Sequence, residues 1–135
     1  MSDLTVTVPP DLLAVTTEVV GRTTVVRAAG EVDMATAPAL QQALFDACLP
    51  ARRPAALVVD LTAVRFFGST GLGLLVVTHR RCLDRGVPLR IVAGAHAVLR
   101  PLEVTGLDLL FDVVPTLDAA LSRAAPRLAS PVPTA

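Results

Sequence analysis

The amino-acid sequence predicts an α/β fold: a mostly parallel central sheet with an antiparallel strand at its N-terminal edge and about four helices. Strand-like and helix-like segments alternate after residue 30, and this order is typical of parallel strands joined by helical crossovers. Residues 55–61 form a short continuous apolar run, as expected of a strand covered on both faces. Residues 12–30 have the pattern of a β-hairpin, which predicts the antiparallel edge.

The length and composition fit one folded domain. The chain has 135 residues, of which 53% are hydrophobic. This length suits a single domain, and this hydrophobic content excludes disorder over most of the chain. We expect an N-terminal extension over residues 1–11, the domain over residues 12–124, and a disordered tail rich in Pro and Ala over residues 125–135.

The first part of the domain is expected to hold the hairpin and one helix. The turn of the hairpin falls at residues 21–22, and Gly30 ends its second strand. Thr36 follows as a helix N-cap, because its hydroxyl can accept from backbone N–H groups two or three residues further on. Pro38 then lies in the first turn, where its missing N–H costs nothing. Apolar residues recur at helical spacing until the helix stops before Pro50.

Three further helices and two strands are expected in the second part. The glycine-rich segment after Phe67 opens an apolar helix that runs to about Arg85, with Gly86 as its C-cap. A strand, a helix ended by Gly106, a strand and a helix capped by Thr116 follow, at residues 89–93, 95–104, 110–114 and 116–124.

Charge and hydropathy exclude two classes of partner. Lys+Arg and Asp+Glu both number 12, and neither Tyr nor Trp occurs. A nucleic-acid binder normally has a basic excess and stacking aromatic residues, so we expect no direct contact with nucleic acid. No apolar run reaches the length of about 18 residues that a membrane-spanning helix needs. The N-terminus lacks the basic and apolar regions of a signal peptide, and we therefore expect a soluble cytoplasmic protein.

The most informative stretch is residues 68–71, Gly-Ser-Thr-Gly. Its two hydroxyl residues fall at a helix N-terminus, at the carboxyl end of a strand, where ligands and partners bind in open α/β sheets. The free N–H groups of a first turn stabilise a phosphate, whether bound or covalently attached. Two other interpretations remain at this point. Ser69 is only an N-cap and the glycines relieve crowding, or residues 68–73 form a nucleotide-binding loop, although no Lys follows as in a P-loop.

Enzymatic and metal chemistry have little support. The segment does not match a nucleophile elbow, and His79 lies about ten residues into the helix, too far from Ser69 to act as its base. Asp60 more often satisfies local N–H groups than performs catalysis. His79 and His96 stand alone, so we expect no metal site and no cofactor. Cys48 and Cys82 lack CxxC spacing and are interpreted as free core thiols, with a redox pair as the alternative.

Several segments, in order and spacing, resemble the STAS domain family of bacterial anti-sigma factor antagonists. The resemblance covers about residues 12–123. It rests on Gly-Glu-Val-Asp at residues 30–33 with Ala-Thr-Ala-Pro at 35–38, on residues 57–61 and 64–73, on residues 102–108, and on Phe111 with residues 116–121. It implies a STAS-like fold.

The resemblance also implies a mechanism. In that family the serine matching Ser69 is phosphorylated by a partner anti-sigma factor that is a serine kinase, and a phosphatase resets it. The unphosphorylated form binds the kinase and frees the sigma factor. The family usually has Asp where this chain has Gly68, which weakens the expectation of efficient phosphorylation. The alternatives are a STAS partner-binding module without phosphorylation, for example a subunit of a lipid-transport complex, and an enzyme with a nucleotide loop.

The expected partner surface combines the loop after residue 30 with the outer stripe of the following helix. We assign Leu72, Leu75, Val76 and Leu83 of that helix to the core because they share one side at helical spacing. The expected partner-binding residues are Glu31, Asp33, Gly68, Ser69, Thr70, Gly71, Leu74, Val77 and Arg81, with Ser69 as the phosphorylation site.

Overall fold

The computed structural model describes residues 12–122 and confirms the predicted fold class. Over those residues one five-stranded sheet has the order β1-β2-β3-β4-β5, with β1 antiparallel to β2 and the other neighbours parallel. The strands are β1 (Leu13–Val20), β2 (Thr23–Val32), β3 (Ala56–Phe67), β4 (Leu89–Val92) and β5 (Asp112–Val114). The helices are α1 (Ala37–Ala47), α2 (Ser69–Arg85), α3 (His96–Thr105), a short 3₁₀ turn η1 (Leu107–Leu109) and α4 (Leu117–Ser122). The extension and the tail expected at the two ends lie outside the described residues.

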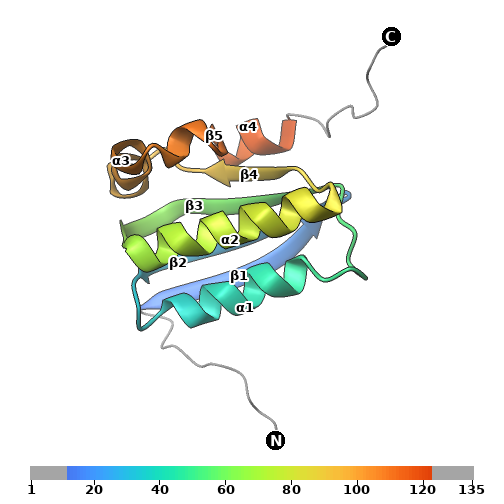
Figure 1. Cartoon of the computed structure of the whole chain (residues 1–135), viewed down its shortest axis with the longest axis horizontal. Helices are drawn as coiled ribbons and strands as arrows, with labels where there is room; N and C mark the ends of the chain where they lie inside the picture. The colour runs from blue at the N-terminus through green and yellow to red at the C-terminus, as the bar shows by residue number, and fades with distance from the viewer. Residues whose placement is uncertain (1–11, 123–135) are drawn as a thin grey trace, which may run out of the picture.

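The helices divide between the two faces of the sheet. The larger cluster of buried residues joins the sheet to α1, α2 and α3, and Figure 1 shows α1 and α2 lying side by side across one face. A smaller cluster joins Val25, Val58 and Val92 to Ala120 of α4 on the other face. The run at residues 56–61 is buried throughout, as predicted for a strand that is covered on both sides.

Strands β2 and β3 extend beyond their predicted ends. Gly30 does not end β2, which continues to Val32 through an irregular register. Its φ of 126° suits glycine alone, and a Cβ at this position would collide with the Leu12 carbonyl. In the extension Glu31 pairs with Phe66, and Val32 pairs with Phe67. The ends of β2 and β3 therefore lie side by side, and so do the loops that follow them.

Three of the predicted helix caps are confirmed and one is not. Gly86 and Gly106 adopt left-handed φ values of 68° and 78° as C-caps, and the Thr116 hydroxyl accepts from the Ala119 N–H at 3.1 Å. Thr36 occupies the N-cap position of α1, but its side chain makes no cap hydrogen bond. Its hydroxyl instead donates to the Glu31 carbonyl at 2.7 Å, because the residue is buried against the end of β2.

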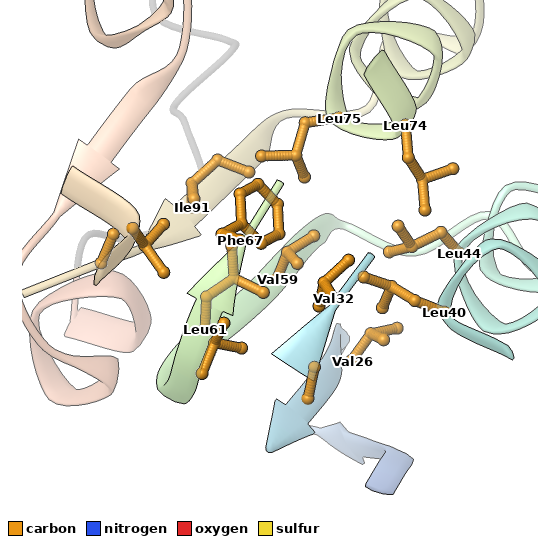
Figure 2. Close-up of a cluster of buried hydrophobic side chains, with 14 of the residues drawn as sticks. Val26, Val32, Leu40, Leu44, Val59, Leu61, Phe67, Leu74, Leu75 and Ile91 are labelled. Carbon is orange, nitrogen blue, oxygen red and sulfur yellow. The ribbon is translucent and has the colours of Figure 1, made fainter. Parts of the chain in front are cut away.

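The predicted faces of α2 are wrong by about one residue. Leu74 is only 6% exposed, whereas Leu83 is 66% exposed. Figure 2 shows Leu74 and Leu75 pointing into the cluster that holds Leu44. The buried stripe consists of Gly71, Leu74, Leu75, Thr78 and Cys82, with Leu72 and Val76 packed at its margin.

The cause of this error is a buried threonine. The Thr78 hydroxyl donates to the Leu74 carbonyl at 2.8 Å, so the side chain satisfies its own polar group within the helix. Thr78 is therefore able to lie in the core with no exposed surface. A pattern that counts only apolar side chains omits Gly71 and Thr78. The buried face predicted from the remaining residues is therefore rotated around the helix axis relative to the observed face.

Candidate partner-binding site at the N-terminus of α2

The candidate site forms where the loops after β2 and β3 meet. The Gly68 N–H donates to the Val32 carbonyl at 2.9 Å, which ties the start of α2 to the end of β2. Ser69 is the first residue of α2, and the loop of residues 33–36 leads from β2 into α1. The structure thus brings together two segments that the sequence had placed at the same edge of the sheet.

Asp33 holds the loop between β2 and α1 in place. Its Oδ1 accepts from the Ala35 N–H at 2.9 Å and from the Thr36 N–H at 3.0 Å. Its own N–H donates to the Thr36 hydroxyl at 3.0 Å. Since the carboxylate is engaged with the backbone of its own loop, Asp33 acts at this site as a positioning residue.

Glu31 offers a carboxylate at the rim of the site. Its side chain is 47% exposed and lies 4.0 Å from the Arg65 guanidinium. An exposed pair at this distance contributes little to stability. Both side chains therefore remain available for a charged partner surface.

Ser69 and Thr70 present two hydroxyls in the first turn of α2. Both residues are exposed. The N-cap of this helix is Gly68, and no described side chain caps the helix or places an acid in its first turn. The interpretation of Ser69 as the N-cap is therefore wrong. Because the N–H groups of a first turn carry partial positive charge, this hydroxyl lies next to an uncompensated positive helix end.

Gly68 and Gly71 differ in what surrounds them. Gly68 has an extended backbone with φ −86° and ψ −177°, and a Cβ there would lie 3.2 Å from the exposed Phe66 ring. A Cβ on Gly71 would lie 2.8 Å from the Phe67 ring and 2.9 Å from Val32. Gly71 is therefore a packing residue that lets α2 approach the sheet, whereas a side chain at position 68 requires only a small shift of the exposed Phe66 ring.

Two exposed apolar side chains lie in the segments next to the start of α2, and the sequence analysis had missed both. Met34 is 79% exposed in the loop before α1, and Phe66 is 52% exposed at the end of β3. Successive residues of a strand face opposite sides of the sheet, so the buried Phe67 requires Phe66 to face away from the core. That alternation was the available signal for Phe66. Met34 and Phe66 are thus exposed apolar residues near the start of α2, whereas Leu74 is buried.

The outer stripe of α2 leads away from the site. Thr70, Gly73 and Val77 are exposed at helical spacing. Arg81 is also exposed, but it lies about 18 Å from Ser69 along the helix, at about 1.5 Å per residue. Its guanidinium lies 3.8 Å from the centre of the Phe45 ring of α1. Arg81 therefore belongs to the other end of α2, and it is not next to Ser69 as the sequence analysis had placed it.

The remaining polar candidates have structural contacts. Asp60 accepts from the Thr62 N–H at 3.0 Å and lies 3.3 Å from Arg27. The His79 ring packs edge-on against Phe111, with ring centres 5.4 Å apart. Among residues 12–122 no group of three or more His, Cys, Asp or Glu side chains is placed to hold a metal ion. In the same part of the chain no helix combines the length and the apolar character needed to cross a bilayer.

Comparison with known proteins agrees with this geometry. The family model described as the STAS domain matches residues 14–120. The anti-sigma-F factor antagonist RsfB of Mycobacterium tuberculosis is 37% identical over 113 residues, which cover 84% of this chain and 90% of that protein. An anti-sigma-B factor antagonist of Bacillus subtilis is 32% identical over 88 residues, 65% of this chain and 78% of that protein.

Solved structures show the same fold. An anti-sigma factor antagonist from Mycobacterium paratuberculosis superposes with a TM-score of 0.77 at 43% identity, over 84% of this chain and 95% of that one. The unphosphorylated form of the antagonist SpoIIAA superposes with a TM-score of 0.65 at 19% identity, over 82% and 96% of the two chains. These proteins are regulators rather than enzymes. The family-model match over residues 14–120 and the structural similarity at 43% identity show that this chain belongs to the STAS domain family.

Proposed function

We propose that the chain is an anti-sigma factor antagonist, that it binds an anti-sigma factor of the serine-kinase type, and that phosphorylation of Ser69 releases this partner. The names of its relatives support the first part, since those in Mycobacterium tuberculosis and Bacillus subtilis are both called antagonists of an anti-sigma factor. A phosphatase that restores the hydroxyl completes the cycle. The chain itself performs no catalytic step.

One observation carries the proposal. Ser69 is exposed at the first position of a 17-residue helix, directly after β3, and the end of β3 and the loop after β2 each carry an exposed apolar side chain. A kinase can reach this hydroxyl, and a partner surface can close over it. Exposed apolar residues next to a functional loop are typical of an interface.

The same position explains how a phosphate would act as a switch. A phosphoserine carries a charge of about −1.5 to −2. In the free protein the helix end stabilises that charge by about 0.3–1 kcal/mol, so the fold survives modification. In the complex the charge must lose its water against the partner surface, which opposes binding.

Ser69 rather than Thr70 is the proposed acceptor. Ser69 leads the helix and lies nearest to the ends of β2 and β3, while Thr70 is β-branched and lies one step further into the first turn. Incubation with ATP and the cognate kinase, followed by peptide mass spectrometry, is expected to place the phosphate on Ser69. A phosphate on Thr70 contradicts this assignment.

The decisive experiment compares three proteins with a purified partner kinase in a calorimetric titration. We expect the unmodified chain and Ser69→Ala to bind with similar affinity and Ser69→Asp to bind at least tenfold more weakly. Thr70→Asp is the matched control, because it places the same charge one residue away, and it should weaken binding less. Equal affinity of the unmodified chain and Ser69→Asp removes the switch from the proposal but leaves partner binding intact.

Gly68 favours a second candidate, a STAS module that binds its partner without a phosphorylation cycle. The family pattern usually has an acid before the serine, and this chain has none there. If this candidate is correct, a demonstrated kinase partner binds the chain but does not modify it, and Gly68→Asp restores phosphorylation. Modification of the unaltered chain at a normal rate rules this candidate out.

A further inference from the structure

The far ends of α1 and α2 bring two cysteines to one cavity. Cys48 is the C-cap of α1, and Cys82 lies in the last turns of α2, on the buried side. Both are buried free thiols, and both line the same cavity. Neither thiol belongs to the site at Ser69, which lies at the opposite end of α2.

The two cysteines line a cavity that opens near the helix ends. Its volume is about 430 Å³, and Arg53, Asp84 and Arg85 supply its charged groups. This volume falls within the usual range for small-molecule sites, roughly 300–1,000 Å³. Cys48 and Cys82 are 6% and 2% exposed, so a small solute reaches them through the cavity while large reagents do not.

The loop after α1 holds one cavity residue in an unusual conformation. Arg53 has a φ of 41°, the one positive φ at a residue other than glycine among residues 12–122. A bulky side chain seldom adopts this region, and such residues cluster at functional sites. Arg53 thus combines a strained backbone with a positively charged side chain in the wall of the cavity.

The charges around the pair make the two thiols unequal. The hydrogen bond from Cys82 lowers the pKa of Cys48, and the positive charges of Arg81 and Arg85 add to this against the opposing effect of burial, to about 7 from an ordinary 9.0. The same hydrogen bond and burial raise the pKa of Cys82. Cys48 is thus the thiolate of the pair, and the thiolate is the reactive form of cysteine.

We propose that Cys48 and Cys82 form a dithiol site that is oxidised by a small hydroperoxide, with Cys48 as the attacking thiolate and Cys82 as the resolving thiol. The proposal rests on the two buried thiols that line one cavity, on the volume of that cavity, which admits the oxidant, and on the arginines at its wall. It is independent of the function proposed for Ser69.

The chemistry proceeds in two balanced steps. The Cys48 thiolate attacks one oxygen of the peroxide, the O–O bond breaks, and the departing hydroxide takes up a proton to become water, which leaves Cys48 as a sulfenic acid. The Cys82 sulfur then attacks the Cys48 sulfur, the S–O bond breaks, and the hydroxide leaves as water with the thiol proton. The protein loses two electrons and two protons, and hydrogen peroxide is reduced to two molecules of water.

The product ties α1 to α2. A disulfide has an S–S distance of about 2.05 Å, shorter than a hydrogen-bonded contact between two sulfurs, so the helix ends draw together and the cavity becomes smaller. Since α1 and α2 carry the two halves of the Ser69 site at their other ends, this bond fixes the spacing of those halves.

The test uses the reduced full-length chain and hydrogen peroxide. We expect an intact mass lower by two hydrogen atoms, and a peptide map without reductant in which the Cys48 and Cys82 peptides are joined within one chain. Added oxygen on the exposed Met34 is expected as well, and the peptide map separates it from thiol oxidation. If both thiols remain open to alkylation after denaturation, or if the cross-link joins two chains, the proposal is overturned.

Single variants assign the roles. Cys82→Ser should leave a sulfenic acid on Cys48 that reacts with dimedone, whereas Cys48→Ser should give a Cys82 that reacts at least tenfold more slowly. For the unaltered chain, iodoacetamide should modify Cys48 first, with a half-maximal rate near pH 7 rather than 9, because Cys82, Arg81 and Arg85 lower the pKa of Cys48. If Cys82 is modified before Cys48, the assignment is overturned. This experiment uses the unaltered chain, so its result does not depend on the folding of a variant.

Discussion

The inner and outer faces of α2 differ in what restricts their residues. The inner face places Gly71, Leu74 and Thr78 against the sheet with almost no exposed surface. The outer face presents Ser69, Gly73 and Val77 to solvent. On the inner face side-chain volume determines which residue fits. On the outer face no packing constraint operates, so the residues there are free to serve a partner.

This difference separates stability from recognition within one helix. A substitution on the inner face changes the free energy of unfolding and affects binding only through the fold. A substitution on the outer face leaves the core packing intact, so it changes binding and affects stability only through helix propensity. The two kinds of effect are measurable on the same variant by denaturant unfolding and by titration with a partner.

The largest expected effect is that of Leu74→Ala. The side chain is buried beside Leu40 and Leu44 of α1 (Figure 2), and removal of a buried leucine costs about 2–5 kcal/mol. Val77→Ala is the control from the outer face and should change the free energy of unfolding by no more than about 0.5 kcal/mol. Urea unfolding that gives both variants the same midpoint would abolish the distinction between the faces.

Gly71→Ala is expected to destabilise the protein although alanine favours helices. The added methyl group meets the Phe67 ring at 2.8 Å and Val32 at 2.9 Å, and overpacking of this kind costs about 1–3 kcal/mol. The gain in helix propensity returns about 1 kcal/mol, which leaves a net loss of up to about 2 kcal/mol. Guanidinium unfolding measures it, and a stabilised variant indicates that the first turn of α2 can move away from the sheet.

The sequence was sufficient for most of the fold because local signals and topology agree. The apolar run at residues 56–61 and the cap at Gly86 each predict one element correctly. The faces of α2 could not be predicted from apolar spacing, since Thr78 enters the core through a hydrogen bond that only the helix geometry supplies. The length of β2 depends on its pairing with β3 at Glu31 and Phe66, which is a tertiary effect.

The candidate site was predictable in part. The place of Ser69 at a helix N-terminus followed from the glycine-rich segment and the strand before it. The engagement of Asp33 with its own loop depends on the position of Thr36, and the exposure of Met34 depends on the path of that loop. Cys48 and Cys82 line the same cavity because α1 packs beside α2 (Figure 1). Their separation along the chain gave no sign of this.

Gly73→Ala tests the outer face of α2. A Cβ at Gly73 meets nothing within 4 Å, so alanine gains helix propensity without overpacking and should stabilise the protein by up to about 1 kcal/mol. Opposite signs for Gly71→Ala and Gly73→Ala, measured in the same urea series, locate the boundary between the faces within two residues. Loss of stability at both positions contradicts an open outer face.

The smallest expected effect on stability is that of Gly68→Asp, at the point where the two faces begin. The extended backbone at this N-cap accepts a side chain, and a carboxylate beside a helix N-terminus contributes about 0.3–1 kcal/mol. Gly68→Asn supplies the cap without the charge, so the difference between the two variants should shrink in high salt as screening weakens the interaction with the helix end.

If the proposed cycle operates, the aspartate of Gly68→Asp should also increase the rate at which a partner kinase modifies Ser69, and the asparagine of Gly68→Asn should not. A different outcome is that the aspartate variant gains stability and is still phosphorylated no faster than the unaltered chain. In that case residue 68 affects stability but not phosphorylation of Ser69, and glycine in place of the usual aspartate has no effect on the cycle.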